Sequence, residues 1–213
     1  SEALPADVLV PALTSTNVRD RAAIVDALRR VLQEMGNPRR VGLVVPDPVA
    51  KVALVKFQQV PSRPQDLDQL IRWQVKKAAP FPIDDAQVSY APASASADGQ
   101  EFLVSVARTD VISEYEALCA DAGAHAGLVD LSTFNVINTV LAGTGAGGDC
   151  LLVNVAPEWA SLAILRGSDV ILFRSRGADG EGTLADLVHQ TAMYYEDRLS
   201  GAGFGRVLVC GAT

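Results

Sequence analysis

The sequence predicts a mixed α/β fold, because short β-branched runs bounded by turn residues alternate with segments of helical periodicity along the chain. Two pairs of neighbouring strand candidates indicate hairpins, which add antiparallel pairing to this alternation. With 213 residues, of which 49% are hydrophobic and 20% charged, the chain is long enough to bury a core in one large domain or two small ones.

The N-terminal region predicts one helix followed by two strands. Apolar residues recur at helical spacing over 18–35, with Asn17 as the expected N-cap and Gly36 at the left-handed position after the helix. The runs 41–45 and 49–57 are expected as strands. Lys51 and Lys56 suggest that the second strand lies at a sheet edge.

A second helix and a hairpin are expected next. Pro64 opens a helical pattern that Pro80 must end. Residues 87–91 and 102–107 are expected as strands joined by an Ala/Ser-rich loop at 92–100. The pattern then predicts a helix over 110–122, with Asp110 as its cap and Gly123 as its stop. A short strand at 128–131 and a helix at 133–141 follow.

A glycine-rich segment at 142–148 is the most linker-like part of the chain, and it divides a first half, 1–141, from a second part, 149–213. Beyond it, strands are expected at 151–155, 162–165 and 170–174, then a helix at 184–199 and a strand at 207–210. Strands, a helix and a further strand occur in the same order on both sides of the linker, which hints at an internal repeat.

The charge distribution is uneven. Eighteen Lys and Arg against 25 Asp and Glu give −7, which argues against a general nucleic-acid binder, since such proteins need a basic surface. Residues 1–80 hold 12 basic and 8 acidic side chains, however, whereas residues 81–213 hold 6 and 17, and no lysine follows Lys77. We interpret this split as two surfaces with different uses.

The cysteines and the ends of the chain indicate the compartment in which the protein works and whether the sequence is a fragment. Three cysteines without C-x-x-C spacing are typical of a reducing compartment. No signal peptide or membrane-spanning segment is recognisable. The chain starts without Met and stops directly after a predicted strand, so we expect a fragment of a longer protein.

Motifs for catalysis and metal binding give little support to an enzyme. The glycines at 143–148 satisfy G-x-G-x-x-G, but a helix precedes them and a strand follows, the reverse of a dinucleotide-binding turn. No G-K-[ST] and no G-x-S-x-G occurs. His125 and His189 have no metal ligand at a usual spacing. We therefore predict no catalytic residue and no metal site.

The most unusual local sequence is 71–85, IRWQVKKAAPFPIDD, in which a predicted helix carrying Trp73 ends against the rigid Pro80-Phe81-Pro82. Trp73 and Phe81 could be core residues of a packed corner. They could instead anchor an extended peptide, because large rigid side chains dominate such interfaces.

This segment resembles the PilM family of type IV pilus assembly proteins, whose members carry a helix with W-x-x-x-x-x-x-P-F-P followed by acidic residues. Trp73, Pro80, Phe81, Pro82, Asp84 and Asp85 match that pattern. The run VGLVVP at 41–46 resembles the family's V-x-L-x-x-P strand. Because PilM is similar to FtsA, the resemblance implies an actin-like, ribonuclease-H-like architecture with an inserted subdomain, here incomplete.

Family members generally bind ATP, and the sequence departs from them where phosphate would lie. In place of the family's D-I-G-x-x-x-T, residues 154–160 contain Asn154, Ala156 and Pro157. Asn154 lacks the carboxylate that orients the metal ion, Ala156 adds a Cβ, and Pro157 removes an amide donor. The adenosine turn is represented only by Gly211-Ala-Thr at the end of the chain. We expect no cofactor, with ATP and Mg²⁺ bound only if a preceding segment restores the site.

The resemblance implies a non-catalytic cytoplasmic scaffold, peripheral at the inner membrane, that recruits a PilN-like membrane protein through its cytoplasmic peptide. Trp73, Phe81 and Pro82 are the expected contacts of that peptide, between the inserted subdomain and its neighbour. Arg72, Lys76 and Lys77 are expected to face anionic lipid or other platform or motor proteins. The alternatives are an actin-like ATPase that changes shape with its nucleotide, and a GspL-like component of type II secretion.

Overall fold

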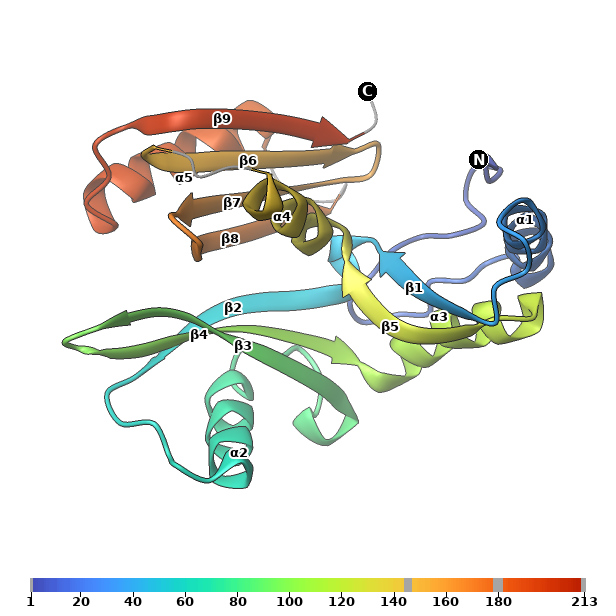
Figure 1. Ribbon diagram of the computed structural model, residues 1–213, viewed down its shortest axis with the longest axis horizontal. Coiled ribbons are helices and arrows are strands. Elements are labelled where there is room, and N and C mark those ends of the chain that lie inside the picture. Colours follow the sequence, from blue (N-terminus) through green and yellow to red (C-terminus); the bar gives the residue numbers. More distant parts are fainter. Residues whose placement is uncertain (1, 144–146, 178–181, 212–213) are drawn as a thin grey trace.

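The computed structural model describes residues 2–143, 147–177 and 182–211, which form three β-sheets and five α-helices (Figure 1). Strands β1 and β5 form one sheet, β2, β4 and β3 a second, and β8, β7, β6 and β9 a third, each in that order. The mixed α/β class predicted from the sequence is confirmed. Within the described ranges, no helix combines the length and apolarity that crossing a bilayer requires.

The first sheet pairs β1 (Arg40–Val45) with β5 (His125–Leu131) in parallel. Helices α1 (Arg21–Glu34) and α3 (Thr109–Ala122) pack against each other beside it, burying Ile24, Val25 and Leu118. A second cluster joins Val45 and Leu131 of the strands to Tyr115 of α3. Two positive φ angles, at Gly36 and Gly123, confirm the predicted helix stops.

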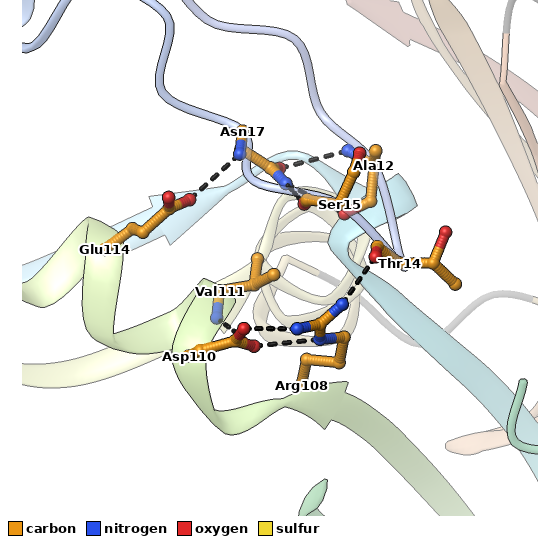
Figure 2. A network of polar contacts seen from close by, with 8 residues as sticks. All are labelled: Ala12, Thr14, Ser15, Asn17, Arg108, Asp110, Val111 and Glu114. Carbon is orange, nitrogen blue, oxygen red and sulfur yellow. Dashed lines mark hydrogen bonds and ion pairs between the residues drawn. The ribbon is translucent and has the colours of Figure 1, made fainter. Parts of the chain in front are cut away.

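Two predicted helix caps are wrong. Asp20, not Asn17, caps α1 by accepting the Ala23 N–H at 3.0 Å. Asn17 is fully buried and holds the preceding loop together: its Nδ2 donates to the carbonyls of Ala12 and Ser15, at 2.9 and 2.8 Å (Figure 2). Helix α3 begins at Thr109, so Asp110 lies inside its first turn and pairs with Arg108.

The second sheet and α2 (Pro64–Val75) form the region that we assign to the predicted inserted subdomain, from β2 (Ala50–Phe57) through β3 (Ala86–Ser96) to β4 (Gly99–Arg108). Its strands are antiparallel, and β2 is an edge strand as predicted. The predicted loop at 92–100 is wrong, because β3 continues to Ser96 and a two-residue turn leads into β4. Gly99 permits this turn with φ +131°, and a Cβ there would lie 2.3 Å from the Phe57 carbonyl oxygen.

The third sheet contains β6 (Asp149–Ala156), β7 (Trp159–Arg166), β8 (Asp169–Gly177) and β9 (Phe204–Gly211), with β9 parallel to β6. Helix α4 (Ser132–Ala142) covers one face, where Ile137 meets Leu152 and Ala163. Helix α5 (Leu184–Arg198) covers the other through Tyr195. Apolar side chains of β6 and β7 point to both faces of the sheet, and a helix covers each face, so these two strands are largely buried.

The predicted linker at 142–148 lies between α4 and β6, and its central residues 144–146 fall outside the described residues. The same holds for residues 212–213, which carry most of the predicted adenosine turn. Helix α4, which precedes the linker, packs against the sheet that follows it. The division into 1–141 and 149–213 stays a prediction.

Candidate functional site

A cavity of about 510 Å³ lies where three parts of the molecule meet. One wall is β3 and β4 of the inserted subdomain, a second is the end of β5 with α4, and a third is the turn from β7 into β8. Its lining is mostly apolar and includes Leu103, Leu128 and Phe134. Such a concave, largely apolar space is the usual form of a binding site for a peptide or small molecule.

The period of two along the strands decides which side chains face this cavity. On β4, Phe102, Val104 and Val106 point to the side covered by α2, where Ile71 and Val75 pack on them. The intervening residues Leu103, Ser105 and Ala107 point to the other side and line the cavity. The inserted sheet therefore carries α2 on one face (Figure 1). The cavity lies on its other face.

Two strand edges border the cavity. Strand β3 is the outer strand of its sheet, and β5 pairs only with β1 among the described strands. Gln87 and residues 89–93 of β3 line the cavity, as do residues 128–131 of β5. Backbone groups on an unpaired edge are available to a further extended chain.

The charged lining of the cavity is entirely acidic. Among the described lining residues, only Asp130 and Asp169 carry a charged group, and neither makes an ion pair. The Asp130 carboxylate accepts the Leu131 N–H at 2.8 Å and the Asn135 Nδ2 at 3.0 Å. These hydrogen bonds fix its orientation without neutralising it, so the cavity favours a positively charged occupant.

The aromatic residues predicted as peptide contacts lie elsewhere. Trp73 is on the outer side of α2 and is 64% exposed, while Phe81 is half-buried against the cluster beneath that helix. Pro82 is exposed just after it. None of the three lines the cavity, which is on the opposite face of the inserted sheet.

The predicted basic surface lies near the end of α2. Arg72 is half-buried and forms an ion pair with Asp68 at 2.9 Å. Lys76 and Lys77 are exposed directly after the helix. Trp73 precedes Lys76 and Lys77 by three and four residues, and all three are exposed.

At the predicted phosphate turn, the polar side chain of Asn154 is hydrogen-bonded within the protein. Asn154 is 3% exposed, and its Nδ2 donates to Ser132 Oγ at 3.1 Å and Thr133 Oγ1 at 2.9 Å. Ala156 ends β6, and Pro157 with Glu158 forms the tight turn into β7. The side chain at the position where the resemblance implies a metal-orienting carboxylate is thus hydrogen-bonded to the start of α4.

A buried carboxylate that the sequence reasoning missed completes this network. Asp47 is fully buried, accepts the Thr133 N–H at 3.0 Å and is also hydrogen-bonded by the Thr133 hydroxyl. Burial raises the pKa of the Asp47 carboxyl above its ordinary value. Because Leu131 provides no side-chain cap, Asp47 caps α4 from 86 residues away. A contact of that sequence separation leaves no local pattern to find.

Comparison with solved structures defines the class. A PilM chain from a PilM-PilN type IV pilus biogenesis complex superposes with a TM-score of 0.71 at 19% identity, over 92% of this chain and 57% of that one. The cytoplasmic domain of EpsL, an inner-membrane component of the Vibrio cholerae type II secretion system, gives 0.58 at 9% identity, over 88% and 68%. A Bacteroides thetaiotaomicron protein with an actin-like ATPase fold and unknown function gives 0.51 at 7%, over 92% and 71%. The fold is therefore actin-like, as the sequence resemblance implied.

Sequence comparison identifies the family. Residues 1–199 match the family described as type IV pilus assembly protein PilM. The chain belongs to this family, which confirms the resemblance seen in the segment around Trp73. No curated protein matches the sequence significantly. The chain spans 57% of the similar PilM chain.

Proposed function

We propose that this protein is a scaffold of the type IV pilus assembly platform and that its cavity holds the cytoplasmic peptide of a PilN-like membrane protein. The observation that carries the proposal is the apolar cavity of about 510 Å³ between the inserted subdomain and its neighbours. Membership of the PilM family and similarity to a PilM chain solved with PilN support it. We also propose that Trp73, which is 64% exposed, contacts another platform or motor protein together with Phe81 and Pro82.

We infer that the scaffold is not an ATPase. In support, Asn154 occupies the position of a metal-orienting carboxylate and is held by Ser132 and Thr133, while Pro157 offers no amide to a phosphate. The two alternatives are an actin-like ATPase and a type II secretion component similar to the EpsL domain. The family match favours the pilus over the secretion system.

A cavity-filling variant tests the proposed site. Ala91 is an exposed residue of β3 that lines the cavity. We expect Ala91→Trp to weaken binding of the fluorescein-labelled cytoplasmic peptide of the cognate PilN-like protein by about tenfold or more, since the indole would occupy the peptide's space. Fluorescence anisotropy measures the affinity. Gln74→Trp, on the exposed side of α2, adds the same ring outside the cavity and is the control. Equal binding by both variants would remove the cavity from the proposal.

We further propose that the end of α2 faces the anionic inner surface of the membrane, which gives the lysine-bearing half of the chain a use. Each basic residue near such a surface contributes about 1 kcal/mol of attraction. Co-sedimentation with anionic vesicles is expected to fall for the Lys76→Glu/Lys77→Glu variant. The Lys51→Glu/Lys56→Glu variant, on exposed positions of β2, changes the net charge equally and is expected to retain binding. A similar loss in both variants would contradict a specific face.

A further inference from the structure

We propose that the cavity selects an extended, basic peptide, which adds as a strand to the outer edge of β3 and brings positive charge to Asp130 and Asp169. This inference rests on the proposed function and specifies the chemistry of the occupant. It combines three observations: an unprotected strand edge, small side chains that face the cavity, and a lining with negative charge only.

The edge of β3 lacks the usual protection against strand pairing. Exposed edge strands commonly carry charged side chains that repel a further strand, yet residues 86–96 contain no charged residue. Pro92 and the bulge between Pro92 and Ala95 interrupt the strand only in its second half. Residues 86–91 therefore have an outer edge to which no described strand is hydrogen-bonded.

The side chains along this edge leave room for an occupant. Ser89, Ala91 and Ala93 line the cavity from alternate positions of β3, and Ser105 lies behind them on β4. The opposite wall supplies Leu128, 63% exposed, with Phe134 and Leu141. Main-chain pairing with β3 would direct every second side chain of a peptide toward this apolar wall, which is how added strands are recognised.

Charge complementarity sets the sign of the occupant. Asp130 from β5 and Asp169, the first residue of β8, line the same cavity, and no Lys, Arg or His is among its described lining residues. Neither carboxylate has an ion-pair partner within the described part of the chain. Such a site attracts a cationic segment and disfavours an acidic one.

The charge is tested by measuring affinity for the cytoplasmic peptide of the cognate PilN-like protein at 20 mM and 300 mM NaCl. Asp130→Asn/Asp169→Asn is expected to bind about tenfold more weakly than the wild type at low salt, with less dependence on salt. The control is Asp84→Asn/Asp85→Asn, which removes two exposed carboxylates outside the cavity and changes the net charge equally. Melting temperatures verify that both variants fold. Equal affinity of the cavity variant and the wild type would overturn the charge selection.

Strand addition is tested with the same peptide, N-methylated at alternate amides. Methylating the amides that face β3 is expected to abolish binding, whereas methylating the intervening amides is expected to preserve it, because strand pairing has a period of two. Equal tolerance of both sets would overturn strand addition while leaving the cavity as the binding site. Failure of the unmodified peptide to bind the wild type would instead overturn the proposed function and this inference with it.

Discussion

At the scale of the residue, Asp47 is the most telling side chain. It is the one fully buried carboxylate in the described part of the chain, and it caps α4 through Thr133. The same Thr133 hydroxyl accepts a hydrogen bond from Asn154. Asp47, directly before β2, is thereby linked through Thr133 of α4 to Asn154 of the third sheet. At the phosphate turn that the sequence resemblance implies, the Asn154 side chain makes a structural contact with α4.

The raised pKa of Asp47 predicts that the free energy of unfolding depends on pH. Because the pKa of Asp47 is raised in the folded state, its stabilising contribution is complete below the unfolded pKa of about 3.9 and is lost as pH rises through the folded pKa. Asp47→Asn keeps an acceptor for the Thr133 N–H and cannot ionise. We expect the stability of this variant relative to the wild type to rise with pH, as measured by urea unfolding between pH 4 and pH 8.

The matched variant Asp47→Ala separates charge from hydrogen bonding. It leaves the buried Thr133 N–H without its acceptor, so we expect a loss of about 1–3 kcal/mol relative to Asp47→Asn throughout that pH range. A pH-independent difference between the wild type and Asp47→Asn would contradict the raised pKa.

At the scale of the element, the start of α1 shows how a plausible cap differs from the real one. Asn17 and Asp20 are both good N-cap residues, and only tertiary contacts distinguish them. Tyr115 donates its hydroxyl proton to Asn17 Oδ1 at 3.0 Å. Glu114 accepts the Asn17 backbone N–H at 2.9 Å (Figure 2). These partners from α3 hold Asn17 in the preceding loop and leave the cap to Asp20.

Substitution at Asp20 tests the assignment. Asp20→Ala removes the acceptor for the Ala23 N–H, and we expect a loss of about 1 kcal/mol in the free energy of unfolding. Asp20→Ser retains a capping oxygen and is expected to restore most of the loss. Thermal unfolding followed by circular dichroism measures both. An Asp20→Ala protein as stable as the wild type would contradict the cap.

The helices and the buried strands were largely predictable, because periodicity and stop signals are local. The amphipathic pattern of α1 and the Gly123 stop of α3 are read from neighbouring residues. Strand β3 was underestimated because its Ala- and Ser-rich second half has low strand propensity, and pairing with β4 overrides that preference. The acidic cavity wall could not be predicted, since Asp130 and Asp169 are distant in sequence.

At the scale of the whole molecule, the sequence resemblance determined the class, whereas the site required the fold. The segment carrying Trp73 was sufficient to suggest the family, and the family match covers residues 1–199. It did not locate the cavity, because α2 and the cavity lie on opposite faces of one sheet. The motif therefore identifies relatives, whereas the proposed binding surface lies on another face of the molecule.

A thermal-shift titration tests the proposal that the protein does not bind nucleotide. A ligand of the native state at a hundredfold excess over its Kd adds about 2.7 kcal/mol of stability. We expect no change in Tm on titration with Mg-ATP, because Asn154 and Pro157 cannot replace the carboxylate and the amide of a phosphate turn. The PilN-like peptide is the positive control. A Tm that rises with nucleotide concentration would restore the ATPase alternative.

The three walls of the cavity belong to parts of the chain that are far apart in sequence, β3, β5 with α4, and the β7–β8 turn. An occupant that touches all three binds one relative arrangement of these parts better than any other. By thermodynamic reciprocity, a second partner that alters this arrangement changes the occupant's affinity by the same factor by which the occupant changes the partner's. The binding of one protein can thus change the affinity of this chain for a second protein that does not contact the first.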